Sequence, residues 1–199
     1  MSGLASWVSV DFRRGELELD VDIADSPFAA LIGPNGVGKT SALRCLAGLE
    51  ATAVVRWATA PPQRIGYLPQ RVMLYPAMSL ADNIASSLRF VGADRKSAMS
   101  RAHELLEMVD IVDLAARRPH EVSGGQRQRA GLARAIAATP DLLLLDEPFS
   151  AIDASSRSAV RARIIEHIAT SGARCIFATH DPADITAAGA ETVSVSPMS

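Results

Sequence analysis

This sequence has few cysteines, few lysines and no long apolar runs. The two cysteines, Cys45 and Cys175, lie far apart and belong to no C-x-x-C pair, so a metal or redox motif is not indicated. No uninterrupted apolar stretch approaches the ~18 residues that a membrane span requires, and the amino terminus lacks the charged and apolar regions of a signal peptide. We therefore expect a protein that is made in the cytoplasm and stays there.

The chain also has little net charge. The formal charge is −2 and the pI is about 6.1, so the basic excess typical of proteins that bind DNA or RNA is missing. Lys39 and Lys96 are the only lysines. With 199 residues the chain is long enough for one large domain, and a multi-domain enzyme is not expected. A mean hydropathy of +0.15 is high for a soluble domain and favours a surface that a partner covers.

One stretch near the amino terminus is a strong signal for phosphate binding. It matches the pattern G-x-x-x-x-G-K-[ST] at every fixed position and reads Gly33-Pro34-Asn35-Gly36-Val37-Gly38-Lys39-Thr40. The apolar run 28–32 before it predicts a buried strand, and residues 41–49 have helical spacing. Glycines let backbone N–H groups turn toward phosphate oxygens, and a helix that starts near Ser41 favours negative charge there. The pattern predicts binding of a nucleoside triphosphate, with Lys39 on the β- and γ-phosphates and the Thr40 hydroxyl on Mg²⁺.

A second candidate anion site begins a later helix. Ser123-Gly124-Gly125-Gln126 precedes an alanine-rich segment that ends before Pro140. Ser123 is a natural helix N-cap, and its hydroxyl, the backbone N–H groups and the helix amino terminus together suit an anion. Two anion sites so far apart in one chain imply that the second has a role of its own.

Polar residues lie at the ends of three further predicted strands. Asp146 and Glu147 follow four consecutive leucines, and His180 and Gln70 each follow a short apolar run. In an open parallel sheet, ligands bind at the carboxyl ends of the strands, so we expect these residues at one crevice. Asp146 is predicted to hold Mg²⁺ directly or through water, and Glu147 to accept a proton from the attacking water. Gln70 would face the metal and that water, and His180 would contact the γ-phosphate.

The remaining chain predicts a strand hairpin and a group of helices. Residues 8–12 and 17–23 alternate apolar and polar side chains, as two paired strands do. Phe12 is a candidate to stack on the nucleotide base, but a core-facing strand residue is at least as good an interpretation. Apolar residues at three- and four-residue spacing predict helices within 80–90 and 97–112.

Together these residues resemble the ATP-binding subunits of ABC transporters over nearly the whole chain. The family's fixed order is a glycine loop, a glutamine, S-G-G-Q, D-E, an x-x-x-D turn and a histidine. Here that order is residues 33–40, Gln70, 123–126, Asp146 with Glu147, 150–153, and His180. The resemblance implies an α/β P-loop NTPase core with a mostly parallel sheet, a small N-terminal antiparallel β-subdomain and a helical subdomain at about 71–130. Residues 1–199 would form a single domain without a C-terminal regulatory domain.

The resemblance also implies roles for the site residues. In the family two such domains pack head to tail, and each ATP lies between the glycine loop of one and the S-G-G-Q of the other, so 123–126 would act in trans. Glu147 would be the general base and His180 the γ-phosphate sensor. Asp146 and Gln70 would be ligands of Mg²⁺ and water, and Asp153 part of the dimer contact.

Residues 70–84 are similar to the segment that contacts the membrane partner in importer-type subunits. The resemblance therefore implies an ATPase that works as a homodimer, or with a paired ATPase subunit, on integral membrane permease subunits. A substrate-binding protein is a further expected partner, and nucleic acid is not. The expected location is the inner face of the cell membrane. Two alternatives stay open: a soluble ABC protein of DNA repair or translation, and a regulatory ATP-binding module.

The sequence departs from the family's pattern in places. The segment between Gly48 and Gly66 is shorter than the family's usual antiparallel strand segment, and Val122 and Ile152 stand where leucine is usual. The two substitutions conserve volume and should matter little. The shorter segment predicts a reduced β-subdomain, with weaker stacking on the base or a shifted dimer.

Overall fold

The structure is a computed structural model that describes residues 6–14 and 17–196. Its strands are β1 (Ser6–Arg14), β2 (Leu17–Ala24), β3 (Phe28–Ile32), β4 (Val54–Trp57), β5 (Ile65–Leu68), β6 (Leu142–Asp146), β7 (Arg174–Ala178) and β8 (Glu191–Ser194). Its helices are α1 (Lys39–Leu46), α2 (Leu80–Phe90), α3 (Arg95–Met108), α4 (Gly124–Ala137), α5 (Ala154–Ser171) and α6 (Pro182–Ala188), with 3-10 turns η1 (Val112–Leu114) and η2 (Pro119–Glu121).

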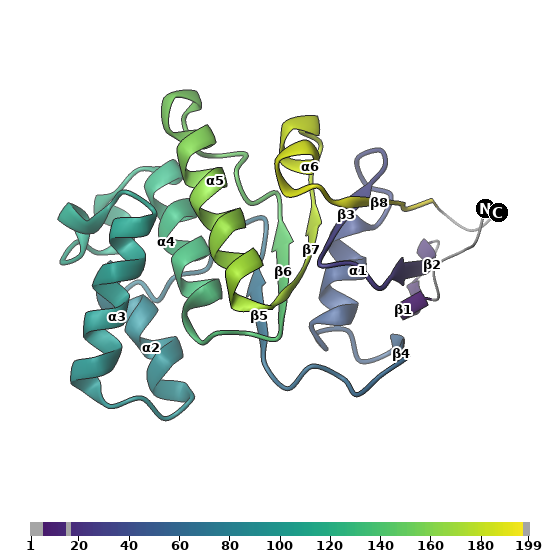
Figure 1. The fold of residues 1–199 in the computed structure, drawn as a ribbon, viewed down its shortest axis with the longest axis horizontal. Helices are drawn as coiled ribbons and strands as arrows, with labels where there is room; N and C mark the ends of the chain where they lie inside the picture. Colours follow the sequence, from purple (N-terminus) through teal and green to yellow (C-terminus); the bar gives the residue numbers. More distant parts are fainter. Residues whose placement is uncertain (1–5, 15–16, 197–199) are drawn as a thin grey trace.

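The strands form two sheets, which confirms the predicted α/β fold. The larger sheet is parallel with the order β5-β6-β7-β3-β8, and the smaller one is antiparallel with the order β2-β1-β4. Parallel neighbours require crossover connections, and helices supply them here. Figure 1 shows the parallel sheet at the centre, with α2, α3 and α4 on the β5 side and the small sheet on the β8 side. The carboxyl ends of β3, β5, β6 and β7 therefore share one edge.

The leucines of β6 separate two hydrophobic cores. Successive side chains of a strand point to opposite faces of the sheet. Leu143 and Leu145 accordingly lie in the core beneath helices α2 to α5, whereas Leu142 and Leu144 lie in the core shared with α1, β1 and β2. Both faces of β6 are buried, which explains why its sequence is a continuous apolar run rather than an alternating one.

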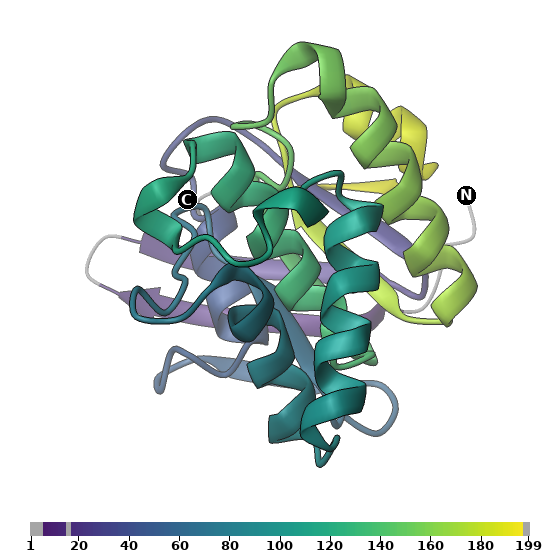
Figure 2. The ribbon, with the colours of Figure 1, turned by 90° about the vertical axis from the view of Figure 1, so that its left-hand side faces the viewer.

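Helices α2, α3 and α4 pack against one another beside the β5 edge (Figure 2). The helix predicted within 80–90 is confirmed as α2. The helix predicted within 97–112 is α3, which starts at Arg95 and ends at Met108, before the positive φ of 59° at Asp110.

Asn83 of α2 is fully buried. Its side chain accepts from the backbone N–H of Tyr75 at 2.7 Å and donates to the carbonyl oxygen of Ser79 at 2.9 Å. One amide thus fixes the loop before α2.

Two glycines allow α4 to pack closely against β5 and the residues that follow it. A Cβ on Gly66 would lie 2.2 Å from the carbonyl oxygen of Ala135, and a Cβ on Gly131 would lie 2.7 Å from Cγ1 of Val72. Neither separation is tolerated between real atoms, so a larger side chain at either position would push the helix away from the strand. The segment that ends in Gln70 is therefore packed directly on α4.

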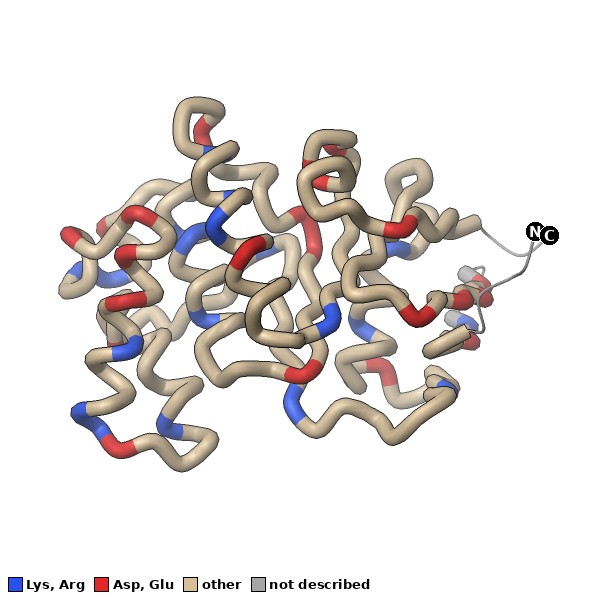
Figure 3. The backbone as a smooth tube through the Cα atoms, in the orientation of Figure 1, with Lys and Arg blue, Asp and Glu red and all other residues tan. Residues whose placement is uncertain are grey.

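In the part of the chain that the structure describes, the distribution of charged residues and the state of the two cysteines agree with the expectations from composition. Acidic and basic residues are interspersed along the backbone (Figure 3). Cys45 and Cys175 are both free and buried, and burial raises the pKa of the Cys45 thiol to about 11. Within residues 6–14 and 17–196, no helix has both the length and the apolar character that crossing a membrane would take.

Candidate nucleotide site

The glycine loop joins β3 to α1. Gly36 and Gly38 have φ angles of 80° and 109°, which residues with a Cβ rarely adopt. Directly after the loop, the Lys39 ammonium donates to the carbonyl oxygens of Gly33 and Pro34, at 2.7 and 3.0 Å. These two bonds hold the positive charge over the loop, where phosphate oxygens of a nucleotide would lie.

Thr40 connects α1 to the end of β6. Its hydroxyl donates to Oδ2 of Asp146 at 2.7 Å. Asp146 is only 2% exposed, and burial raises the pKa of its carboxyl while the bond from Thr40 opposes that shift. A hydroxyl and a carboxylate oxygen side by side are hard oxygen ligands of the type that Mg²⁺ prefers, the rest coming from phosphate and water. The donor set of the described residues therefore fits Mg²⁺.

Glu147 and His180 lie next to each other at the ends of β6 and β7. Glu147 has a left-handed φ of 50°, uncommon for a residue other than glycine, and its backbone N–H donates to the carbonyl oxygen of Ala178 at 2.9 Å. Its Oε1 is 2.9 Å from Nδ1 of His180. This hydrogen bond raises the pKa of His180 and so favours the imidazolium form. The pair joins a carboxyl group to an imidazole at the sheet edge.

A cleft of about 450 Å³ brings most of the predicted residues together. It is lined by Asn35, Gly36, Gly38, Lys39, Thr40, Ser41, Gln70, Asp146, Glu147, Ser150 and His180. The predicted residues thus come from the glycine loop and from the ends of three neighbouring strands, as the parallel topology requires. Val37, by contrast, is buried in the core and supports the loop from below.

The S-G-G-Q stretch caps α4 as predicted. The Ser123 hydroxyl accepts from the backbone N–H of Gln126 at 3.2 Å, and Oε1 of Gln126 accepts from the backbone N–H of Ser123 at 2.8 Å. This reciprocal pair is a capping box. Residues 123–126 are not among the described residues that line the cleft. The two predicted anion sites are therefore separate within one chain.

Two buried polar side chains, which no sequence motif singles out, link α4 to the segment after β6. Gln128 is 3% exposed, and its Nε2 donates to the carbonyl oxygens of Glu147 and Pro148 at 3.1 and 3.0 Å. Arg129 is also buried and lies 2.9 Å from Oδ1 of Asp153. Polar residues in the first turns of a helix give no functional signal until their burial is known. Asp153 therefore makes a contact within its own chain, whatever its part in a dimer.

Phe12 does not line the cleft, and its burial in the core contradicts the stacking hypothesis. Its side chain is 2% exposed and lies in the core with Val8, Val10 and Leu19. The reason is the period of a strand, which puts residues 8, 10 and 12 on one face of β1. The alternative interpretation, a core-facing strand residue, is correct. None of the described residues that line the cleft is a phenylalanine, tyrosine or tryptophan.

The fold and the cleft together define a class of protein. A glycine loop between a strand and a helix, next to an acidic strand end in a parallel sheet, is the arrangement of a P-loop NTPase.

The chain belongs to the ABC transporter family, whose sequence model matches residues 17–150. It is 41% identical over 177 residues to the sulfate/thiosulfate import ATP-binding protein CysA of Caulobacter vibrioides, covering 82% of this chain and 52% of the relative. It is 42% identical over 172 residues to the spermidine/putrescine import ATP-binding protein PotA of Pseudomonas fluorescens, covering 82% of this chain and 48% of the relative. The chain thus spans about half the length of these curated relatives.

Solved structures support the fold. A dimeric ATP-binding cassette in a post-hydrolysis state, bound to ADP and Pi, aligns with a TM-score of 0.80 at 23% identity and covers 95% of this chain and 94% of that one. An ABC transporter in an inward-facing conformation aligns with a TM-score of 0.75 at 27% identity, covering 97% of this chain and 80% of that chain.

Proposed function

We propose that this chain hydrolyses ATP as the ATP-binding subunit of an ABC importer. The observation that carries the proposal is the cleft where Lys39, Thr40, Asp146, Glu147 and His180 converge. The relatives that support it are named as import ATP-binding proteins. Their substrates differ, and in the proposal the permease selects the substrate.

In the proposed reaction, Lys39 and the N–H groups of the glycine loop bind the β- and γ-phosphates. Glu147 accepts a proton as the oxygen of water attacks the γ-phosphorus, and the bond to the bridging oxygen breaks with its electron pair leaving on ADP. Nδ1 of His180 faces Glu147 at 2.9 Å, so the other ring nitrogen is the donor to the γ-phosphate. Gln70, exposed at the end of β5, orients the water.

The metal in this proposal is Mg²⁺. It would be held by Thr40 and Asp146 and would supply positive charge beside the phosphate oxygens. The hydroxyl of Thr40 donates to Asp146, so the two proposed ligands lie next to each other. Gln70 lines the same cleft and is the third proposed ligand, directly or through water.

The S-G-G-Q site acts on the nucleotide of a second subunit. At the start of α4, Ser123 and Gly124 are exposed, Gly125 and Gln126 are half-buried, and none of the four lines the cleft of its own chain. A two-fold dimer would place this start over the partner's γ-phosphate and would give two equivalent sites. Asp153, already paired with Arg129, would lie close to the same interface.

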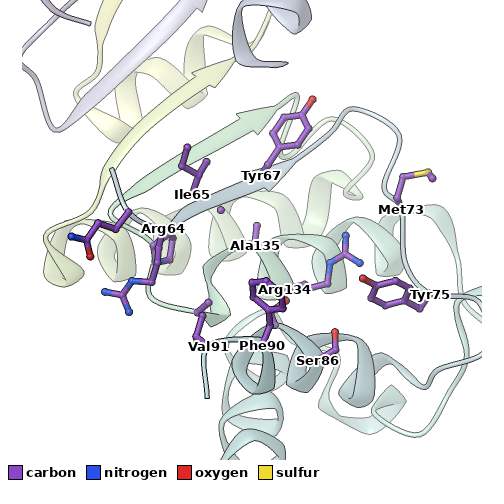
Figure 4. A pocket seen from close by; sticks show the side chains of 15 residues that line it. Arg64, Ile65, Tyr67, Met73, Tyr75, Ser86, Phe90, Val91, Arg134 and Ala135 are labelled. Atoms are coloured by element: carbon purple, nitrogen blue, oxygen red, sulfur yellow. The ribbon is translucent and has the colours of Figure 1, made fainter. Parts of the chain in front are cut away.

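The permease contact is proposed at a groove beside Gln70. The groove has a volume of about 600 Å³ and lies between β5, α2 and α4 (Figure 4). Phe90 is 92% exposed and Met73 66% exposed, and the guanidinium of Arg134 lies 5.7 Å from the centre of the Tyr75 ring. An amphipathic helix of the permease fits such an apolar groove, with Arg134 as a polar anchor. This contact would hold the subunit on the inner face of the cell membrane.

Glu147→Gln tests the proposed reaction. A positioned general base contributes about 10²–10⁴-fold, so we expect phosphate release to fall at least ~100-fold while ATP binding is retained. Light scattering should then show a dimer that accumulates only with ATP. Glu166→Gln, on the exposed face of α5, is the matched control and should hydrolyse ATP like the wild type. Equal turnover in Glu147→Gln and the control, or no ATP hydrolysis by the wild type, would refute the proposal.

A further inference from the structure

A buried ion pair lies behind His180, outside the cleft. Asp184 of α6 is 3% exposed, and its Oδ1 is 2.7 Å from Nε of Arg161 on α5. The Thr179 hydroxyl donates to the other oxygen of Asp184 at 2.6 Å. None of these three residues lines the cleft. Desolvating a charge pair opposes folding, so stability alone is a weak explanation for the pair.

The cluster fixes the residues on both sides of His180. The Thr179 hydroxyl accepts from the backbone N–H of Asp181 at 3.1 Å, and Nη2 of Arg161 donates to Oδ2 of Asp181 at 3.1 Å. The side chain of His180 is itself 69% exposed, so little packing holds the ring. The position of this imidazole therefore depends on the backbone that the cluster anchors.

Arg161 also reaches the segment that carries Glu147. Its guanidinium carbon lies 5.7 Å from the centre of the Phe149 ring, two residues after Glu147. Phe149 is 4% exposed, and a cation over an aromatic face in a buried setting is attractive. The side chain of Arg161 is only 11% exposed, so a single, largely buried cation contacts both loops.

We propose that Arg161 is a positioning residue that sets the separation of Glu147 and His180. It acts through the residues that flank them and touches neither the nucleotide cleft nor the reacting atoms. Its effect on turnover rests on the proposed ATPase function, whereas its effect on the Glu147–His180 contact does not. A displacement of about 1 Å in a catalytic group costs on the order of 10²-fold in rate.

The variants must separate positioning from folding. Arg161→Met alone leaves the Asp184 carboxylate buried and unpaired, which can unfold the chain. Arg161→Met combined with Asp184→Asn removes both charges, and the asparagine carbonyl can still accept from Thr179. Asp184→Asn alone is the reference, because it keeps Arg161. Arg163→Met, an exposed arginine of the same helix, is the matched control, and Arg161→Lys is the conservative variant.

An NMR titration of the histidine ring protons reports on the Glu147–His180 contact and does not require ATP hydrolysis. The chain has four histidines, and the signal that His180→Gln removes is that of His180. Glu147 raises the pKa of His180, with smaller contributions from Asp181 and Asp184. If loss of Arg161 moves Glu147 away from His180, the pKa of His180 in the double variant should be lower than in Asp184→Asn. The kcat for ATP should fall roughly 10–100-fold with KM within about twofold, because the phosphate loop is untouched. Arg161→Lys should recover part of the loss and Arg163→Met should match the wild type.

The outcomes are distinct. A double variant with the His180 pKa and the kcat of Asp184→Asn would overturn the positioning role. A loss of kcat matched by Arg163→Met would overturn it as well. Absence of ATP hydrolysis by the wild type would refute the proposed function, and the histidine titration would still decide whether Arg161 sets the contact.

Discussion

Replacing Thr40 with valine removes the hydroxyl that donates to Asp146 and keeps the shape of the side chain. The bond is 2.7 Å long, and its acceptor is a carboxylate only 2% exposed. Hydrogen bonds to charged groups contribute about 1.5–3 kcal/mol, and the variant leaves the carboxylate buried with one donor fewer. We expect the free energy of unfolding to fall by about that amount at neutral to alkaline pH. In a domain of this size Tm should fall by roughly 3–12 °C.

Thermal unfolding followed by circular dichroism measures this difference. Thr40→Ser retains the hydroxyl and is the control, with an expected loss of about 1 kcal/mol or less for the missing methyl group. Burial raises the pKa of Asp146, so the deficit of the valine variant is complete above that pKa and shrinks as the pH falls through it. If the valine and serine variants unfold at the same temperature at alkaline pH, the bond to Asp146 contributes no stability and the reasoning is wrong.

Two other substitutions test the packing of α4 and the Glu147–His180 pair. Gly66→Ala should lower the free energy of unfolding by about 1–3 kcal/mol, because its Cβ would lie 2.2 Å from a backbone oxygen of α4. Urea denaturation measures the loss, and Gly124→Ala, with its nearest neighbour at 3.9 Å, should show almost none; equal losses would contradict the close approach. His180→Gln should cost more stability near pH 6 than near pH 9. The pair with Glu147 raises the pKa of His180, so its stabilisation is complete below the unfolded pKa of about 6.5 and is lost as the pH rises through the folded pKa. Thermal unfolding at both pH values checks this, and a larger cost near pH 9 would exclude the ion pair.

The glycine loop and the cap at Ser123 could be predicted from sequence because their determinants are local. A strand, a loop with Gly36 and Gly38 at positive φ, and a helix follow one another within a few residues. Glu147 and His180 could be placed at one edge because parallel strands end together. Local sequence patterns and the common direction of the parallel strands thus account for the site residues that could be predicted.

The remaining site residues depend on partners far away in the chain. Arg161 meets Asp181 twenty residues later, and Gln128 meets Glu147 nineteen residues later. In the sequence, each is a polar residue in a helix, which normally faces solvent. The stacking hypothesis for Phe12 was wrong for a related reason. Alternation identifies the two faces of a strand, but it does not tell which face packs on the core and which is open to a nucleotide.

The burial of both native thiols has a practical value for experiments on the assembly. Cys45 and Cys175 are free and buried, the pKa of Cys45 is about 11, and the sequence has no other cysteine. Thiolate is the reactive form, so a maleimide at neutral pH would react with an introduced surface cysteine and leave the native ones alone. A single substitution at Met73, which is 66% exposed, would therefore give one spin label or fluorophore per copy on an otherwise natural background.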